Sequence, residues 1–455
     1  MPIRKVDGTS LGYYLITFDK TGKVRDESEA KIQEILRILS SESITDVFIF
    51  SHGWLSDVSA AEQQYDKWIK KMAAQEADIQ LMQQVRPGFR PLLIGLHWPS
   101  LPWGDEKLES AIISSDPETP DLIEKKFSER IADTPKAKEA LRTIGEAVIK
   151  QNSDPFEFPP EAKNAYAQLN EEAPLGNEGE GAEPGSDREP PDPQRMYENV
   201  MKEPKKGDFN IAQFAKEALL APLRATSFWS MKARACQIGE SSGSQLLEKL
   251  QKQAPTARFH LMGHSFGCIV VSAMLASPKA HGTLIRPVNS LALVQGALSL
   301  WSYCKKIPVL PGESRPGYFH RLISGHTVNG PIITTYSEHD TAVGKWYPRA
   351  AGVARQIDYA PDLPKYGGIG SWGIRGDDLN SVNKDMRSLE AKEPKYKFEL
   401  GRIYNLNSSK FICRKPELFR LGSFIVYDPG GAHNEIAERE VAHAVWSAAL
   451  SSSRD

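Results

Sequence analysis

Cysteine is scarce in this chain of 455 residues, and its four copies are far apart: Cys236, Cys268, Cys304 and Cys413. None of them forms the Cys-x-x-Cys spacing of a zinc knuckle or a redox pair. The cysteines therefore indicate free thiols and exclude a metal or redox centre built on them.

Long apolar runs are also missing. No stretch of the sequence approaches the ~20 apolar residues that a membrane-spanning helix needs. The first eight residues, Met-Pro-Ile-Arg-Lys-Val-Asp-Gly, lack the apolar core of a secretory signal peptide. We therefore expect no transmembrane segment, and we expect a cytoplasmic protein.

The chain also lacks an excess of charge of either sign. The 56 Lys and Arg residues nearly balance the 58 Asp and Glu residues, which leaves a net charge of -2. Such a chain has no overall field that would attract nucleic acid or an anionic membrane, so no nucleic-acid partner is expected. The length allows either two or three average domains or one large α/β domain with insertions.

Short apolar runs alternate with helical patterns over the first hundred residues. Residues 13–18, 47–50 and 92–96 are predicted strands, and residues 27–39 and 65–72 carry apolar side chains at helical spacing. Unbroken apolar runs are typical of strands that are covered on both faces, as in a parallel sheet. The pattern predicts a doubly wound, mostly parallel α/β fold.

This alternation stops between residues 101 and 210. Helices are predicted at 121–132 and 135–150. In residues 171–194, 17 of 24 positions are Asp, Glu, Pro or Gly and none is aromatic. Such a segment cannot bury enough apolar surface to offset its ordering entropy, so we expect a disordered segment or a mobile loop there.

Apolar periodicity returns in the second half of the chain. Helical composition covers 211–221 and 228–250, and further strands are predicted at 291–294, 332–336 and 424–427. Residues 341–422 are irregular in composition and hold one possible strand at 397–404.

A Gly-x-Ser-x-Gly pattern, Gly263-His264-Ser265-Phe266-Gly267, joins an apolar run to a segment of helical composition. A serine at the apex of so sharp a strand-to-helix turn has strained backbone, and glycines beside it let the strand and the helix pass closely. This context predicts that Ser265 is a nucleophile rather than a loop residue.

A serine hydroxyl needs a base within hydrogen-bond reach and an acid that orients the base. Asp340 follows the predicted strand 332–336, and His433 lies in a Gly-rich turn after the last apolar run. The alternative to the acid role is that Asp340 simply closes a turn after its strand. His443 is the competing base, but it lies inside a helical pattern, where a packed histidine is the ordinary case. His339 is interpreted as a turn residue or a pocket wall.

With its Ser, Asp and His in this order at successive strand ends, the chain resembles the α/β-hydrolases. The resemblance covers about 47–100 and 235–450. It implies catalytic roles for Ser265, Asp340 and His433, and an oxyanion hole formed by the backbone N–H groups of Phe266 and of Trp54 in a His-Gly-Trp loop.

The resemblance also implies the domain organisation. Residues 1–100 and 235–455 would form the α/β-hydrolase core, and residues 101–234 would be an insertion. Together with the aromatic segment 299–330, that insertion is expected to form a helical cap or lid over an apolar pocket, and the alternative is a surface subdomain that packs elsewhere.

Two further patterns are set aside. Residues 368–373 match Gly-x-Gly-x-x-Gly, but no apolar strand precedes them and no apolar helix follows, so a dinucleotide site is not expected. His260 and His264 are four residues apart across a strand and a turn, which does not give the geometry of a zinc site. We expect no cofactor and no metal.

The leading hypothesis is a serine hydrolase that cleaves a small-molecule or lipid-like carboxylic ester through an acyl-enzyme. The same three residues would also serve an amide, peptide or thioester hydrolase. A binding protein that retains the fold without catalysis is the alternative from a different class, with the acidic segment 171–194 as a possible docking element.

Overall fold

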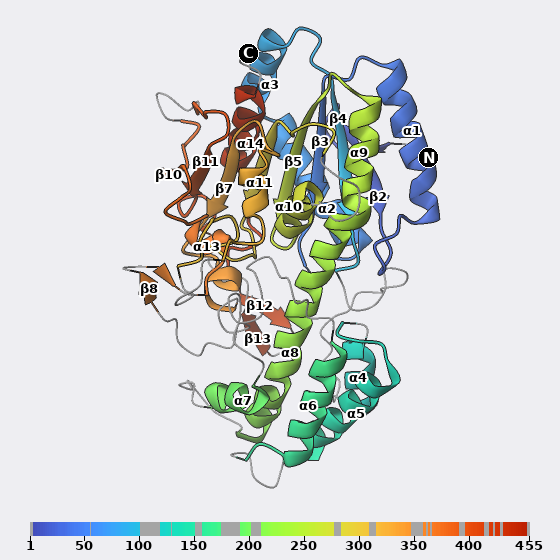
Figure 1. The fold of residues 1–455 in the computed structure, drawn as a ribbon, viewed down its shortest axis with the longest axis vertical. Coiled ribbons are helices and arrows are strands. Elements are labelled where there is room, and N and C mark those ends of the chain that lie inside the picture. The colour runs from blue at the N-terminus through green and yellow to red at the C-terminus, as the bar shows by residue number, and fades with distance from the viewer. Residues whose placement is uncertain are drawn as a thin grey trace.

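A mostly parallel sheet with helices on both faces dominates the computed structural model of the chain, and a separate group of helices extends from it (Figure 1). The structure describes residues 3–54, 56–100, 119–128, 130–150, 157–173, 192–201, 211–276, 284–308, 315–346, 358–360, 363–364, 366–390, 396–413, 418–421, 424–427 and 431–452.

Nine strands of the described residues form the sheet, in the order β1-β2-β4-β3-β5-β6-β7-β11-β10. They are β1 (Arg4–Lys5), β2 (Gly12–Thr17), β3 (Asp46–Ser51), β4 (Pro91–His97), β5 (Arg258–His264), β6 (Ser290–Val294), β7 (Ile332–Tyr336), β10 (Ser381–Asp385) and β11 (Ile403–Asn407). Only β1 is antiparallel to its neighbour. The predicted α/β class with a mostly parallel sheet is confirmed.

Helices cover both faces of this sheet, which explains the unbroken apolar strands. One face packs against α1 (Asp26–Ser41), α9 (Ser244–Gln253) and α10 (Gly267–Ala276). The other packs against α2 (Val58–Ala73) and α14 (Arg439–Ser451), with α3 (Glu76–Val85) beside them. The sheet therefore lies between two apolar layers, and α11 (His320–Ser324) adds to the first.

The part between 341 and 422 is more regular than its composition predicted. Strands β10 and β11 extend the sheet in parallel beyond β7, whereas the prediction placed one strand at 397–404. β10 is a half-exposed edge strand with the sequence Ser-Val-Asn-Lys-Asp, so it lacks the apolar run that marks a buried strand. The short helices η2 (Ala342–Trp346) and α13 (Ile369–Trp372) also lie in this part.

The last apolar run, predicted as a strand at 424–427, is confirmed as a strand, and it lies outside the main sheet. That run is β13 (Phe424–Tyr427), which pairs in antiparallel fashion with β12 (Leu418–Leu421) in a separate two-stranded sheet. A second small pair joins β8 (Asp358–Ala360) to β9 (Leu363–Pro364).

The helix predicted to break between 221 and 228 is continuous. Helix α8 (Ile211–Ile238) runs through Pro222 and passes via one π-helical turn, η1 (Gly239–Gly243), into α9. Leu219, Leu220 and Leu223 are buried on both sides of the proline. We infer that this burial outweighs the roughly 3 kcal/mol that an interior proline costs a helix.

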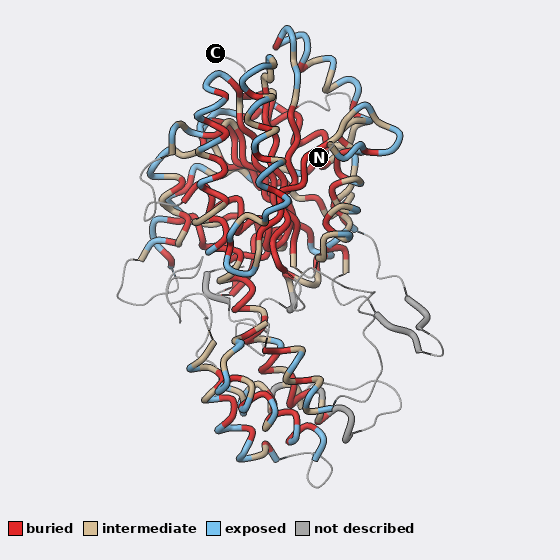
Figure 2. The backbone as a smooth tube through the Cα atoms, turned by 90° about the vertical axis from the view of Figure 1, so that its right-hand side faces the viewer, coloured by how far each residue is buried: buried red, intermediate tan, exposed pale blue. Residues whose placement is uncertain are grey.

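A second group of helices has its own apolar core and lies beyond the carboxyl ends of the strands (Figures 1 and 2). It consists of α4 (Pro120–Ser128), α5 (Pro135–Lys150), α6 (Pro160–Glu172), α7 (Pro193–Met201) and the first half of α8. The boundary expected at 234 falls inside α8, which joins this group to the sheet. The acidic segment 171–194 begins and ends in helix, and its residues 174–191 lie outside the described part.

Candidate active site

Ser265 sits at the turn between β5 and α10, where sequence analysis placed it. Its φ of 54° is in the left-handed region that non-glycine residues rarely adopt. Glycine is required on both sides of Ser265 because other parts of the backbone approach these two positions closely. A Cβ at Gly263 would meet the backbone of Gly267, and a Cβ at Gly267 would meet the carbonyl oxygens of Ser51 and His52. The strained turn holds the serine hydroxyl at the carboxyl edge of the sheet.

Three of the predicted residues form one hydrogen-bonded chain. The Nε2 atom of His433 lies 2.8 Å from the hydroxyl oxygen of Ser265, and its Nδ1 atom lies 2.8 Å from Oδ2 of Asp340. Because a carboxylate can only accept, Nδ1 of His433 donates to it, and Nε2 is left to accept the hydrogen of the serine hydroxyl. The arrangement has the geometry that removes a proton from Ser265.

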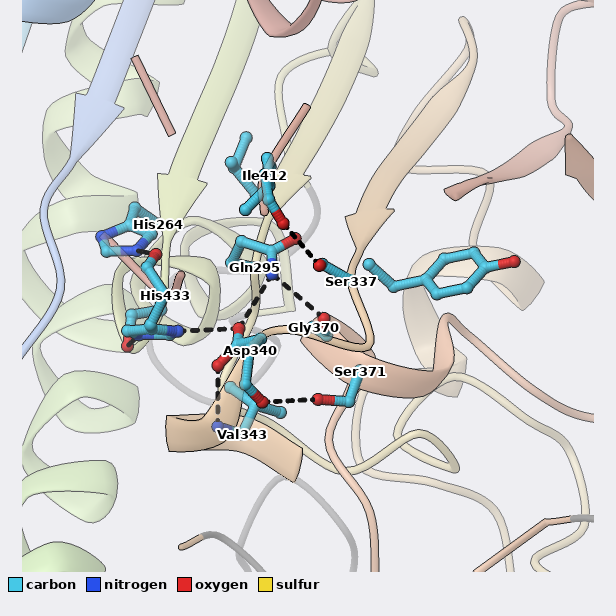
Figure 3. Close-up of polar contacts among 12 residues, drawn as sticks. His264, Gln295, Ser337, Asp340, Val343, Gly370, Ser371, Ile412 and His433 are labelled. Atoms are coloured by element: carbon cyan, nitrogen blue, oxygen red, sulfur yellow. Dashed lines mark hydrogen bonds and ion pairs between the residues drawn. The ribbon is translucent and has the colours of Figure 1, made fainter. Parts of the chain in front are cut away.

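Asp340 is buried at 1% exposure, and two further donors hold its carboxylate. The Val343 backbone N–H donates to Oδ1 at 2.9 Å, and the Gln295 side-chain amide donates to Oδ2 at 2.9 Å (Figure 3). These bonds replace the water that a buried carboxylate loses. The position of Asp340 shortly after β7 is as predicted.

His433 is not carried to the site by a strand of the main sheet. It follows the β12–β13 pair, and local backbone contacts fix it instead. Gly431 forms an isolated β-bridge with Asp340, and the Ala432 N–H donates to the carbonyl oxygen of His339 at 3.0 Å. Gly431 has a φ of 58°, a region that glycine adopts readily. His339 thus contributes through its backbone, while its side chain is exposed.

His264 links the turn to the same loop. Its Nε2 atom lies 3.0 Å from the carbonyl oxygen of His433 (Figure 3). Its Nδ1 atom lies 2.8 Å from the amide nitrogen of Gln64 on α2. Burial, followed by the neighbouring His433, holds the pKa of His264 well below its usual value. The ring is therefore neutral, accepts from Gln64 at Nδ1 and donates from Nε2.

The loop His52-Gly53-Trp54 lies against the serine. A Cβ at Gly53 would be 2.7 Å from the Cβ of Ser265. The His52 ring is buried, which holds its pKa well below the usual value, and its Nδ1 atom donates to the Gly53 carbonyl oxygen at 2.8 Å. Because C=O and N–H point in opposite directions across a trans peptide, this contact turns the Trp54 N–H away from His52.

Neither Trp54 nor Phe266 donates its backbone N–H to an acceptor in the part of the chain that the structure describes. For Phe266 the reason is its place just before the first turn of α10, where N–H groups have no partner in the helix. Their rings stack with centroids 5.6 Å apart, and Phe228 of α8 packs edge-on against both. Trp54 and Phe228 are only partly buried, so aromatic surface remains near Ser265.

His443, the competing histidine, is not at this site. It lies within α14, and its Nδ1 atom is 2.8 Å from the carboxylate of Asp78 on α3. The segment 368–373 packs beside the site through α13, and the Gly370 carbonyl accepts a hydrogen bond from Gln295.

A second Ser–His–Asp contact set occurs at the opposite end of the strands. His260 Nδ1 lies 2.8 Å from Ser290 Oγ, and His260 Nε2 lies 3.0 Å from Asp46 Oδ1. Asp46 also pairs with Arg86. All four side chains are buried, and ligands of open α/β sheets bind at the other, carboxyl end of the strands. This set is therefore a packing feature of the core.

Gln64 and Gln295 were missed by sequence analysis. Gln295 follows directly after the apolar run 291–294, so a polar residue at the carboxyl end of a buried strand was the signal that could have found it. Gln64 lies on a half-exposed helix face and carries no comparable signal.

Comparison of the chain with protein-family models, curated proteins and solved structures gives no match. Within the described residues, no helix is both long and apolar enough to cross a membrane, and no three His, Cys, Asp or Glu side chains are grouped to hold a metal ion.

Proposed function

We propose that the protein is a serine hydrolase of the α/β-hydrolase type that cleaves a carboxylic ester through an acyl-enzyme. The observation that carries the proposal is the continuous chain from Ser265 Oγ through His433 to Asp340, with both links at 2.8 Å. Its three members come from distant parts of the sequence and meet at the carboxyl edge of the sheet, where such folds bind ligands.

In this mechanism Ser265 Oγ attacks the ester carbonyl carbon while His433 Nε2 takes the hydroxyl proton. The charge that develops on the carbonyl oxygen faces the backbone N–H groups of Trp54 and Phe266. The imidazolium then gives its proton to the leaving alkoxide, and the alcohol departs. Asp340 remains a carboxylate and orients the ring.

Deacylation repeats these steps with water as the nucleophile. His433 takes a proton from water, the resulting hydroxide attacks the acyl carbon, and the tetrahedral intermediate collapses to release the acid. The proton returns to Ser265 Oγ, which restores the starting state. No group outside the chain is required by this scheme.

The aromatic surface around Ser265 supports an apolar or lipid-like substrate group. Trp54, Phe228 and Phe266 pack together, and two of them retain exposed surface. Because Phe228 comes from α8, we propose that this helix and the helical group it carries act as the cap of the site.

Steady-state hydrolysis of p-nitrophenyl esters tests the function. We expect turnover by the wild-type protein and a loss of at least about 10³-fold in kcat for Ser265→Ala. Ser290→Ala is the matched control, because it removes the serine of the second contact set and should retain kcat. Turnover that survives in Ser265→Ala would refute the acyl-enzyme, and hydrolysis of anilides or thioesters but not esters would change the substrate class.

A further inference from the structure

Gln295 occupies a strained and fully buried position between the two ends of the proposed triad. It follows β6 directly, and β6 lies between β5, which leads to Ser265, and β7, which leads to Asp340. Its φ is 47° and its exposure is 0%. A non-glycine residue held in the left-handed region costs roughly 1–3 kcal/mol, and such residues cluster at functional sites.

The orientation of the Gln295 amide is determined by Thr335 of β7. The Thr335 hydroxyl accepts a hydrogen bond from the Gln295 backbone N–H at 3.1 Å and donates its own hydrogen to the side-chain oxygen, Oε1, at 3.0 Å. Since Oε1 faces Thr335, the Nε2 group faces the other way. It donates to Asp340 Oδ2 at 2.9 Å and to the Gly370 carbonyl at 3.2 Å (Figure 3).

Oδ2 of Asp340 is the same oxygen that accepts the His433 Nδ1 hydrogen. The carboxylate is thus held from three directions, by His433, by Gln295 and by the Val343 backbone. Loss of the Gln295 donor would leave the buried Oδ2 one hydrogen bond short, and the carboxylate would be free to turn away from the imidazole.

We infer that Gln295 is a positioning residue that keeps Asp340 Oδ2 aimed at His433. This inference rests on the proposed hydrolase function. Among the described residues Gln295 forms no hydrogen bond with Ser265, and its link to the proposed triad is the bond to Asp340. The nearly complete use of its hydrogen-bonding groups distinguishes this role from that of a residue that only fills space.

The decisive variants are Gln295→Met and Gln295→Glu, with Gln251→Met as matched control. Gln251 is an equally buried glutamine that bonds Arg286 far from the site. For Gln295→Met we expect kcat for p-nitrophenyl acetate to fall about 10- to 100-fold with KM within about two-fold, since the reacting groups lose alignment and substrate contacts remain. Gln251→Met should match the wild type.

Gln295→Glu supplies a readout that a filler residue would not change. A protonated carboxyl can donate to Asp340 as the amide does, but an ionised one places a second negative charge beside Oδ2. Between pH 6 and 8.5 we expect the ratio of variant to wild-type kcat to fall from near one toward the value of Gln295→Met. A ratio that does not change with pH, or wild-type activity in both variants, would overturn the inference.

Near-UV circular dichroism and the thermal midpoint report whether each variant folds. If Gln295→Met does not fold, Gln295→Glu and Thr335→Val carry the test, because Thr335→Val releases the amide without changing Gln295 and should lower kcat in the same direction. If the wild type is active and the ratio of Gln295→Glu to wild-type kcat does not change with pH, only the positioning role of Gln295 is refuted. If the wild type is inactive and no fluorophosphonate labels it, both the proposed function and this inference are refuted.

Discussion

The Nε2 atom of His264 lies 3.0 Å from the carbonyl oxygen of His433, so the neighbour of the proposed nucleophile holds the backbone of the proposed base. His433 is carried by a loop rather than by a strand of the main sheet. A hydrogen bond from the rigid turn therefore places the imidazole relative to Ser265, and Gln64 fixes the tautomer that donates it.

Replacement of His264 by phenylalanine keeps the ring and removes this donor. We expect His264→Phe to lower kcat on a p-nitrophenyl ester about 10- to 100-fold, because a shift of the base by roughly 1 Å misaligns the proton transfer. His443→Phe is the control, since that histidine is equally buried but pairs with Asp78. An unchanged kcat in His264→Phe would show that the loop needs no such anchor.

We expect three buried histidines, His52, His260 and His264, to make the free energy of unfolding depend on pH. Burial is the first cause in each and lowers the pKa well below the usual value. Below about pH 6.5 the unfolded chain binds protons at these residues that the folded chain does not bind, so stability is fully present above that pH and is lost as pH falls.

Each such histidine contributes a slope of about 1.4 kcal/mol per pH unit between its two pKa values. Urea unfolding followed by tryptophan fluorescence at pH 7 and pH 5.5 measures the loss. His260→Gln should reduce the slope by up to that amount, and His339→Gln, which replaces an exposed side chain, is the control. Equal slopes in wild type and His260→Gln would contradict the neutral buried state.

Gly53 has no room for a side chain beside Ser265. The added Cβ of Gly53→Ala would be 2.7 Å from the Cβ of Ser265, so the loop must move and carry the Trp54 N–H with it. We expect kcat to fall about 10²- to 10³-fold, as for the loss of one oxyanion donor. Gly88→Asn in an open, exposed turn is the control. Normal turnover by Gly53→Ala would exclude the loop from the proposed oxyanion hole.

Phe228 connects α8 to the aromatic surface at the site. Phe228→Ala should lower kcat/KM for p-nitrophenyl octanoate about 10-fold more than for the acetate, because lost apolar contact affects only the longer chain. Phe89→Ala removes a partly buried ring that packs against Trp446, away from the site. If both esters respond equally to Phe228→Ala, α8 does not contact the acyl group.

The turn at Ser265 and the position of Asp340 at the carboxyl edge of the sheet were predictable because their signals are local. Each follows a short apolar run at a strand end, and glycines mark the steric demand of the turn. The support of His433 was not predictable, because it depends on contacts between residues far apart in sequence, such as His264 and Gly431.

The same distinction applies to the fold. Strands β2 to β7 are apolar and were found, whereas β10 is a polar edge strand and β11 contains Asn405 and Asn407. Asn405 is fully buried and bonds the backbone of Ile374, a compensation that only the folded chain reveals. Helical composition was predicted only for 211–221 and 228–250, whereas α8 is continuous through Pro222, because the burial on both sides of this proline depends on tertiary packing.

Labelling by a fluorophosphonate, located by peptide mass spectrometry, shows whether Ser265 is the nucleophile. The residues that the structure describes hold two Ser–His–Asp contact sets, one at the carboxyl end of the strands and one buried at the other end. We expect one phosphonate adduct per chain, on Ser265, that persists in Ser290→Ala and disappears in Ser265→Ala and on denaturation before labelling. Absence of an adduct from the folded protein, or an adduct on another residue, would contradict this expectation.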